Sequence, residues 1–173
     1  SDCLVGSEMC IRDRIKGAEL VELKECNTKE DPVRPELDNT FRRSYGRKIF
    51  GVKYKREIHA VMCFAYTNEI PKSVEELDIM SQDAHLQSTL RGQNVGKIAI
   101  AYTVWSKKKG GGKLIVKEVF NKIKKSNHLN RLVTLSPLTD MAYKFHIKNG
   151  AKLISVNETT QNFEYKVIKN KKY

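Results

Sequence analysis

A glycine triplet between a predicted strand and a predicted helix constrains the fold of this chain more than any other feature. Residues 96–106, "GKIAIAYTVWS", are apolar on both faces over part of their length, as in a central strand of a sheet. The sequence "KKKGGGK" follows, and then residues 114–123, whose apolar side chains recur at helical spacing. A strand that leads through a glycine loop into an amphipathic helix indicates a layered domain of strands and helices.

The glycine loop has the composition of an anion-binding site. The first turn of a helix leaves several N–H donors without partners, and the helix dipole places positive potential there. Glycines let a phosphate approach the backbone, and lysines surround the loop at positions 107, 108, 109 and 113. The spacing matches neither a Walker loop nor a dinucleotide-binding fingerprint. A flexible polar turn is the alternative interpretation.

The remaining elements follow from periodicity and from capping signals. Strands are predicted over residues 19–25 (alternatively a short helix), 47–54, 58–67, 131–137, 151–156 and 163–168, and helices over 73–90 and 139–150. Residues 27–46 are polar, contain two prolines and are expected to form a loop. This order predicts an α/β or α+β domain with a mixed sheet.

Charge and cysteine content limit the classes of function. The 173 residues have a net charge of +12, and without residues 1–14 the charge is +13, which favours a polyanionic partner such as nucleic acid or a nucleotide cofactor with several phosphates. Outside residues 1–14 the cysteines are Cys26 and Cys63, without metal-site spacing. We therefore expect a reducing, cytoplasmic environment, no metal site and, because no apolar run approaches about 18 residues, no membrane span.

Residues 1–14 are treated separately. The sequence "LVGSEMCIRDR" within them resembles the translation of a sequencing-library transposon adapter, as found at the ends of metagenomic reading frames. We interpret residues 1–14 as an assembly artefact, the alternative being a poorly ordered native N-terminus. The expected domain then covers residues 15–173.

The order of elements around the loop resembles the acyl-CoA-binding core of the GNAT acetyltransferase superfamily. The pyrophosphate signature of that superfamily is Gln/Arg-x-x-Gly-x-Gly/Ala, and Lys107-x-x-Gly110-x-Gly112 matches it with lysine in the first position. The resemblance implies a mixed central sheet with helices on both faces. It also implies that the strands at 97–105 and 132–136 splay apart around the pantetheine arm of CoA. The implied CoA-binding residues are Trp105, Ser106, Lys107, Lys109, Gly110, Gly111, Gly112 and Lys113.

Two further motifs resemble malonyl-CoA decarboxylase. "VTLSP" at 133–137 is similar to the family's serine motif, and "KFHIKNGAKL" at 144–153 is similar to its histidine motif. The resemblance implies that Ser136 and His146 are the catalytic residues. It covers roughly residues 58–155, and the chain departs from the family by lacking the PGF that follows the serine, a long segment between the two motifs and a helical N-terminal domain.

The superfamily offers a second comparison for the histidine. Many acetyltransferases carry Ala-x-x-Leu/Phe-Tyr-x-x-x-Gly on the last helix, where the tyrosine faces the thioester sulfur. Residues 142–151, "AYKFHIKNGA", keep this frame and have His146 in place of the tyrosine. We therefore expect the imidazole to face the acyl group, although packing of a lone histidine against the core is the structural alternative.

These residues suit the decarboxylation of a malonyl thioester. The reaction leaves an enolate that must be stabilised and then protonated on carbon. Histidine has an unperturbed pKa near neutrality and suits the proton transfer. Ser136 would either donate a hydrogen bond to the substrate or act as a nucleophile with His146 as its base. A turn residue before Pro137 is the structural alternative for the serine.

Two other functions stay open at this point. One is a GNAT-type N-acetyltransferase using acetyl-CoA, for which no convincing base is found in the sequence. The other is a non-enzymatic basic binding module, partly supported by Lys117, Lys122, Lys124 and Lys125, but interleaved aromatic residues are few. We therefore expect acyl-CoA rather than nucleic acid as the partner, and no cofactor beyond CoA itself. The oligomeric state is open, and a homodimer is compatible with the sequence.

Overall fold

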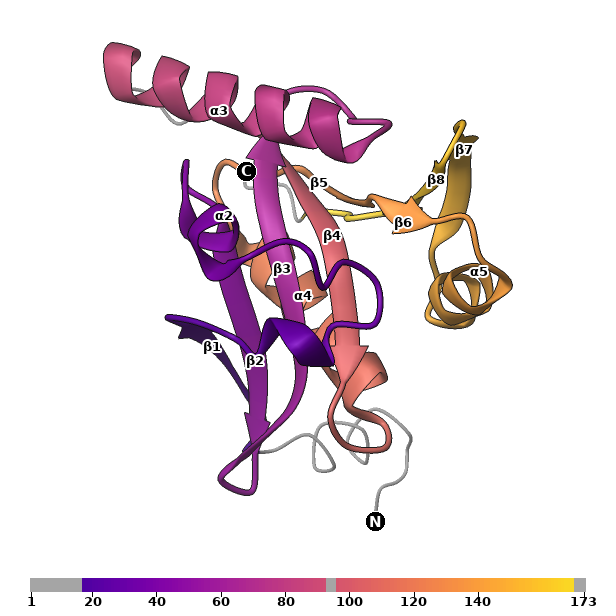
Figure 1. Cartoon of the computed structure of the whole chain (residues 1–173). Helices are drawn as coiled ribbons and strands as arrows, with labels where there is room; N and C mark the ends of the chain where they lie inside the picture. The colour runs from indigo at the N-terminus through magenta and orange to yellow at the C-terminus, as the bar shows by residue number, and fades with distance from the viewer. Residues whose placement is uncertain (1–16, 93–95, 170–173) are drawn as a thin grey trace.

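A computed structural model describes residues 17–92 and 96–169, so the interpretation of residues 1–14 lies outside the described residues. Eight strands form one mixed sheet in the order β1-β2-β3-β4-β5-β8-β6, with β7 paired to β8 (Figure 1). The strands are β1 (Glu19–Leu23), β2 (Lys48–Tyr54), β3 (Glu57–Thr67), β4 (Ile98–Ser106), β5 (Arg131–Thr134), β6 (Ser136–Pro137), β7 (Lys152–Val156) and β8 (Thr160–Tyr165). Among these pairs, β4 and β5 run parallel and the others antiparallel.

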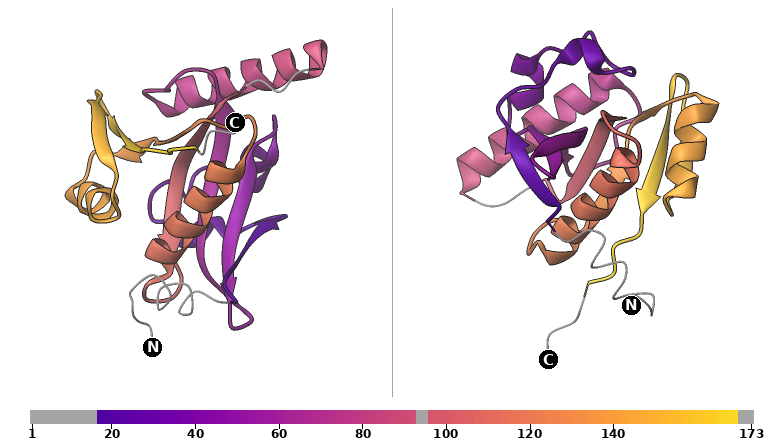
Figure 2. Two further views of the ribbon diagram at one scale, coloured as in Figure 1. Left: turned by 180° about the vertical axis from the view of Figure 1, so that it is seen from behind. Right: turned by 90° about the horizontal axis from the view of Figure 1, so that it is seen from below.

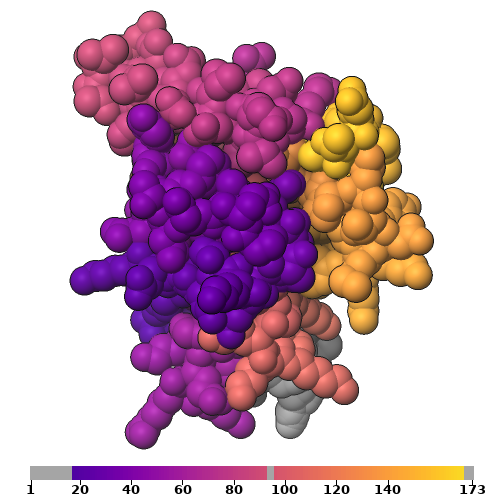
Figure 3. Space-filling model, in the orientation of Figure 1, coloured from indigo at the N-terminus to yellow at the C-terminus, as the bar shows by residue number. Residues whose placement is uncertain are grey.

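Helices lie on both faces of the sheet, which confirms the predicted fold class (Figure 2). They are the 3-10 turn η1 (Thr28–Glu30), α2 (Asn39–Arg43), α3 (Val74–Arg91), α4 (Gly111–Lys125) and α5 (Asp140–Lys148). Helix α4 packs against one face, where Ile115, Val119 and Ile123 join the core formed with Phe50 and Phe64. The other face is covered by α3 and by the segment between β1 and β2 (residues 24–47), which contains η1 and α2. We call residues 24–47 the N-terminal segment, and it spans the middle of the view in Figure 3.

The start of α3 shows how local sequence sets an element boundary. The hydroxyl of Ser73 accepts a hydrogen bond from the backbone N–H of Glu76 at 3.1 Å, as the capping signature predicts. The Glu76 carboxylate accepts from the N–H of Lys72, one residue before the cap. Leu77 on the next turn is fully buried against the sheet. Capping therefore fixes where the helix begins, and one apolar side chain fixes which side faces the core.

The parallel pairing between β4 and β5 is short. Four residue pairs connect them, from Ile98↔Arg131 to Ala101↔Thr134, and one further hydrogen bond joins the N–H of Leu135 to the carbonyl of Ala101. Beyond this point β5 gives way to β6, which also pairs with β8 but is not paired with β4 (Figure 1). A bulge at Tyr102 marks the same level on the other edge of β4. The predicted splay of the two central strands is thus present.

The predicted loop over 27–46 is wrong in part, because η1 and α2 form within it. Asp38 caps α2 by accepting from the N–H of Phe41, so an aspartate at an N-cap position was the missed signal. The strand predicted over 131–137 is interrupted at Leu135, where the pairing with β4 ends while β8 remains the neighbour on the other side. The last strand begins three residues earlier than predicted, at Thr160.

A buried ion pair anchors this N-terminal segment to the sheet. One carboxylate oxygen of Asp31 accepts hydrogen bonds from the N–H groups of Val33 and Arg34 and from the hydroxyl of Thr103 on β4. The other oxygen lies 2.9 Å from Nη2 of Arg42, as an ion pair rather than a well-aligned hydrogen bond. Both side chains are fully buried, so each charge depends on the other.

Removing the charge of Asp31 should therefore cost far more stability than removing a surface charge. We expect Asp31→Asn to lower the free energy of unfolding by about 3 kcal/mol, because Arg42 stays buried without its counter-charge. Glu22→Gln, which breaks the exposed pair with Lys48, should cost less than about 1 kcal/mol. Urea unfolding of both variants checks this, and equal effects would contradict it.

Candidate functional site

The glycine loop is held tightly between β4 and β3. The N–H groups of Lys107 and Lys108 both donate to the carbonyl of His59 on β3. Gly110, the N-cap residue of α4, has a φ of +82°, a conformation that side-chain-bearing residues rarely adopt. At Gly111 an added Cβ would lie 2.0 Å from the carbonyl oxygen of His59. These two glycines are therefore required by backbone geometry.

The first turn of α4 is partly satisfied by the protein itself. The N–H of Gly112 donates to the hydroxyl of Ser106 at 2.7 Å, and that of Gly111 donates to the carbonyl of Lys108. For the N–H groups of Gly110 and Lys113, the described residues provide no partner. The arrangement leaves an anion two free donors and the positive end of a helix dipole.

The lysines around the loop are exposed and only loosely paired. Nζ of Lys107 lies 3.6 Å from the Glu30 carboxylate, and Nζ of Lys108 lies 3.6 Å from that of Glu57. Exposed pairs of this kind contribute little to stability, so these lysines can turn to another anion at small cost. Lys109 and Lys113 are exposed as well. The predicted phosphate-binding residues therefore lie together around one helix N-terminus.

Helix α5 packs against the same loop. A Cβ added at Gly112 would meet the Phe145 ring at 2.7 Å, so the absence of a side chain at 112 lets the aromatic ring approach α4. Phe145 in turn lies edge-on to His146, with ring centroids 5.1 Å apart. This contact connects the glycine motif to the histidine motif, two segments that the sequence separates by more than thirty residues.

His146 is 4 % exposed and lies over β8. Its Nδ1 is 2.7 Å from the hydroxyl of Tyr165, and its ring lies 5.0 Å from that of Phe163. Nε2 has no hydrogen-bond partner in the described chain, yet it is not among the fully buried polar atoms that lack one. The burial lowers the pKa of His146 to about 4, so the imidazole is neutral at pH 7.

Ser136 is also buried, at 4 % exposed, on the same face of the sheet as the residues under His146. Its Oγ lies 2.8 Å from the hydroxyl of Thr134. Thr134 Oγ1 accepts a hydrogen bond from the N–H of Phe163, the residue on which the imidazole stacks. The serine and the histidine are thus joined through Thr134 and Phe163, and no direct hydrogen bond connects the two described side chains.

The side chain of Trp105 points away from the loop. It is 6 % exposed in the core on the α2–α3 face, with the Arg42 guanidinium 5.8 Å from its ring, and its Nε1–H has no partner in the described chain. Its backbone pairs with Val61 on β3, while the opposite edge of β4 beyond Tyr102 has no neighbouring strand among the described residues. Any part of Trp105 that lines the predicted pantetheine site is therefore its backbone.

Sequence reasoning missed Tyr165 and Thr134 as neighbours of the site. Tyr165 is 19 residues from His146, and burial raises the pKa of its phenol, so it stays neutral over the physiological range. Thr134 lies two residues before Ser136, which places both side chains on one face of an extended chain. That alternation was the available signal for Thr134, whereas nothing local marks Tyr165.

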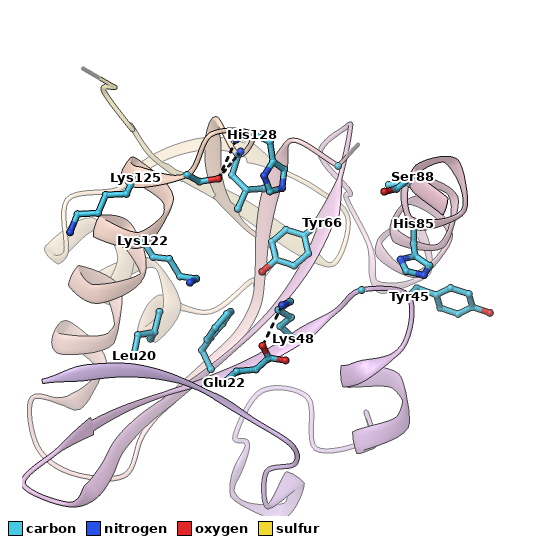
Figure 4. Close-up of a pocket in the computed structure, with 16 residues that line it drawn as sticks. Leu20, Glu22, Tyr45, Lys48, Tyr66, His85, Ser88, Lys122, Lys125 and His128 are labelled. Atoms are coloured by element: carbon cyan, nitrogen blue, oxygen red, sulfur yellow. Dashed lines mark hydrogen bonds and ion pairs between the residues drawn. The ribbon is translucent and has the colours of Figure 1, made fainter. Parts of the chain in front are cut away.

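A large cavity of the described chain lies elsewhere. Its volume is about 760 Å³, and it opens between the C-terminal parts of α3 and α4 over β1, β2 and β3 (Figure 4). Its rim carries the ionisable side chains of Glu22, Lys48, His85, Lys122, Lys125 and His128. None of the predicted site residues lines it. The chemistry at the glycine loop and α5, rather than cavity size, therefore defines the candidate site.

The chain is similar to known proteins in structure but not in sequence. No family model matches the chain, and neither does any curated protein sequence. The loading GNATL domain of CurA from Lyngbya majuscula has a TM-score of 0.59 at 12 % identity, covering 86 % of this chain and 97 % of that one. The GphF GNAT-like decarboxylase, solved with isobutyryl-CoA, has a TM-score of 0.61 at 9 % identity over 86 % and 98 %.

A malonyl-CoA decarboxylase from Agrobacterium vitis is similar as well. Its TM-score is 0.54 at 16 % identity over 74 % of this chain, which spans only 35 % of that protein. These likenesses show that the chain has a GNAT-like fold. Within that fold, it resembles malonyl-CoA decarboxylase and GNAT-like decarboxylases, alongside N-acetyltransferases such as PseH from Campylobacter jejuni at a TM-score of 0.51.

No helix among the described residues is long and apolar enough to cross a membrane. No group of three or more His, Cys, Asp or Glu side chains in that part of the chain is arranged to hold a metal ion.

The close approach of Gly111 to β3 is directly testable. Gly111→Ala should lower the free energy of unfolding by about 2 kcal/mol, because the new methyl group displaces the His59 carbonyl or the helix start. Lys113→Ala, on the same turn but exposed, should leave stability nearly unchanged. Chemical denaturation gives both values, and an unchanged midpoint for Gly111→Ala would refute the packing described above.

Burial of a neutral histidine makes stability depend on pH. Folding lowers the pKa of His146 from its ordinary 6.5 to about 4, so between these values the unfolded chain binds a proton that the folded chain does not. The neutral imidazole therefore contributes roughly 3 kcal/mol to the free energy of unfolding above pH 6.5. This contribution is lost as the pH falls towards 4. His146→Gln should remove this part of the acid sensitivity in urea unfolding at pH 7.5 and pH 4.5. Equal pH dependence in both proteins would show that the imidazole is not buried neutral.

Proposed function

We propose that the protein decarboxylates a β-carboxyacyl thioester of CoA, such as malonyl-CoA, with His146 as the proton-transfer residue and Ser136 as a substrate-binding residue. The observation that carries the proposal is that the glycine loop, the histidine motif and the serine motif lie side by side in the fold. Phe145 places α5 against the glycine loop, and Phe163 with Thr134 connects the imidazole to Ser136. The likeness to GNAT-like decarboxylases supports it at the level of fold.

The split between β4 and β5 offers a path for the pantetheine arm of the substrate. With the pyrophosphate at the glycine loop, the pantetheine arm would run along the unpaired edge of β4 from Ser106 towards Tyr102. Four residues of strand span roughly 13 Å. The acyl end would then lie where the strands part, beside the peptide bond that joins Leu135 to Ser136.

The neutral state of His146 shapes the proposed mechanism. An entering carboxylate raises the pKa of a neighbouring imidazole, so Nε2 takes up one proton from solvent as the substrate binds. In the imidazolium, Nδ1–H donates to the Tyr165 hydroxyl, which stabilises the charged ring. Loss of CO2 leaves the electron pair of the broken C–C bond on the enolate. The α-carbon then takes the Nε2 proton, and the ring returns to its neutral form.

For Ser136 the geometry supports hydrogen bonding rather than covalent catalysis. A nucleophilic serine needs a base within hydrogen-bond reach, and Ser136 Oγ pairs instead with Thr134. Because Thr134 Oγ1 already accepts from Phe163 N–H, it can give its own proton to Ser136. The Ser136 proton is then free to bind the developing enolate oxygen, which is where charge stabilisation contributes most.

Turnover of malonyl-CoA tests the proposal. Acyl-CoA species would be followed by mass spectrometry with wild type, Ser136→Ala and His146→Asn. We expect acetyl-CoA from the wild type, a loss of roughly 100-fold or more in His146→Asn and of roughly 10- to 100-fold in Ser136→Ala. In D2O the product should contain one deuterium in its methyl group. Acetyl-CoA consumption only in the presence of an amine would instead indicate an N-acetyltransferase, and no turnover of malonyl-CoA or its homologues would exclude the proposed reaction.

Tyr165 should act as a positioning residue for the imidazole. Tyr165→Phe keeps the ring but removes the acceptor for Nδ1–H, so the imidazolium loses its partner. We expect kcat to fall by roughly 10-fold, and the pH-rate profile to shift towards acid because protonation of His146 becomes harder. Tyr143→Phe, on the exposed side of α5, is the matched control. A fall in kcat without a shift of the profile would leave Tyr165 a purely structural role.

A further inference from the structure

Arg34 reaches into the point where the two central strands separate. Its Nε donates to the carbonyl of Tyr102 on β4 at 2.9 Å, and its Nη2 donates to the carbonyl of Leu135 at 3.1 Å. The residue comes from the N-terminal segment that crosses in front of β4 in Figure 1 and is only 7 % exposed. One guanidinium group thus bridges the two backbone carbonyls at the apex of the split.

Bridging uses only part of this side chain. A guanidinium has five N–H donors, and the two hydrogen bonds leave three of them. Nη1 has no partner among residues 17–92 and 96–169, and it is not one of the fully buried polar atoms without a partner. Donors therefore remain on the side of the guanidinium that the two strands do not occupy.

The charge of Arg34 is also left without a close counter-charge. Asp31, the buried acid of this segment, pairs with Arg42, and no carboxylate of the described chain lies within 4 Å of the Arg34 guanidinium. The buried group of Asp31, Arg34 and Arg42 therefore carries one excess positive charge. Desolvation at this position lowers the pKa of Arg34, because burial disfavours its charged form. A buried charge of this kind is stabilised when an anion binds beside it.

We propose that Arg34 binds the terminal carboxylate of the acyl group, so that the site selects thioesters of dicarboxylic acids over acetyl-CoA. This inference rests on the proposed CoA site, in which the acyl end lies at the apex of the split beside Leu135 and Ser136. A planar guanidinium matches a carboxylate with two parallel N–H donors. The same contact would fix the plane of the carboxylate relative to the thioester, which decarboxylation requires.

A purely structural role for Arg34 predicts something different. If the guanidinium only satisfies the two strand carbonyls, its loss deforms the split and weakens the binding of every CoA ester alike. If it also binds the acyl carboxylate, its loss weakens the binding of malonyl-CoA further than that of acetyl-CoA. The ratio of the two affinities therefore separates the two roles.

The experiment is a calorimetric measurement of Kd for malonyl-CoA and acetyl-CoA, made in the His146→Asn background to prevent turnover. With Arg34 present, we expect malonyl-CoA to bind roughly 10- to 100-fold more tightly than acetyl-CoA. Arg34→Gln should abolish this preference, because malonyl-CoA loses roughly 10- to 100-fold more affinity than acetyl-CoA. Arg43→Gln, which removes an exposed arginine of α2, should keep the preference.

Three results would overturn the proposal: no preference with Arg34 present, an unchanged preference in Arg34→Gln, or an equal loss of affinity for both esters. If Arg34→Gln does not fold, Arg34→Lys decides, because it keeps the charge but not the planar fork and should weaken malonyl-CoA binding more than acetyl-CoA binding. Release of CO2 is a separate measurement. A preference that depends on Arg34 without CO2 release would contradict the decarboxylase proposal alone, and CO2 release with an Arg34-independent preference would contradict only the role of Arg34.

Discussion

The separation of β4 from β5 is the constraint on which the rest of this structure depends. After four residue pairs the two strands part, and each leaves backbone N–H and C=O groups without the neighbour that a sheet normally supplies. Such groups are costly to bury without partners. The chain meets this requirement at the apex with Arg34, whose guanidinium takes the carbonyls of Tyr102 and Leu135. Along the rest of the β4 edge, an extended ligand with amide groups would meet the same need.

The N-terminal segment therefore helps to form the split between β4 and β5 and does more than connect two strands. Asp31 orders the turn that presents Arg34, and it also ties that turn to β4 through Thr103. Arg42 then neutralises Asp31 and donates to the carbonyl of Arg34. Because these groups are buried, each depends on the others, and the network behaves as one unit that sets the shape of the split.

The electrostatic environment of His146 follows from where α5 lies. Aromatic rings surround the imidazole, so water cannot stabilise its charged form, and the pKa falls to about 4. An unperturbed histidine would be partly charged at neutral pH. In this structure the ring is neutral at pH 7, and the proposed mechanism links its proton uptake to substrate binding.

Much of the fold was predictable because it depends on local periodicity. The glycine loop between β4 and α4, the cap at Ser73, the hairpin of β2 and β3 and the apolar stripe of α4 all follow from neighbouring residues. The predicted site residues Ser136 and His146 do lie on one face of the sheet. Prediction failed where contacts with distant segments decide the local structure. Examples are the interruption at Leu135 and the two short helices between Cys26 and Tyr45.

The sequence by itself determined most of the strands and helices and the glycine-rich start of α4 among four lysines. The reason is that the periods of 2 and 3.6 residues and the conformational freedom of glycine are properties of the local chain. Only the tertiary structure decided that Tyr165 holds the imidazole from 19 residues away, and that Arg34 bridges carbonyls 68 and 101 residues distant. The physical reason is that burial depends on which elements pack against each other in the folded domain. Burial in turn sets the charge state of His146 and leaves the charge of Arg34 unpaired. No local pattern records those contacts.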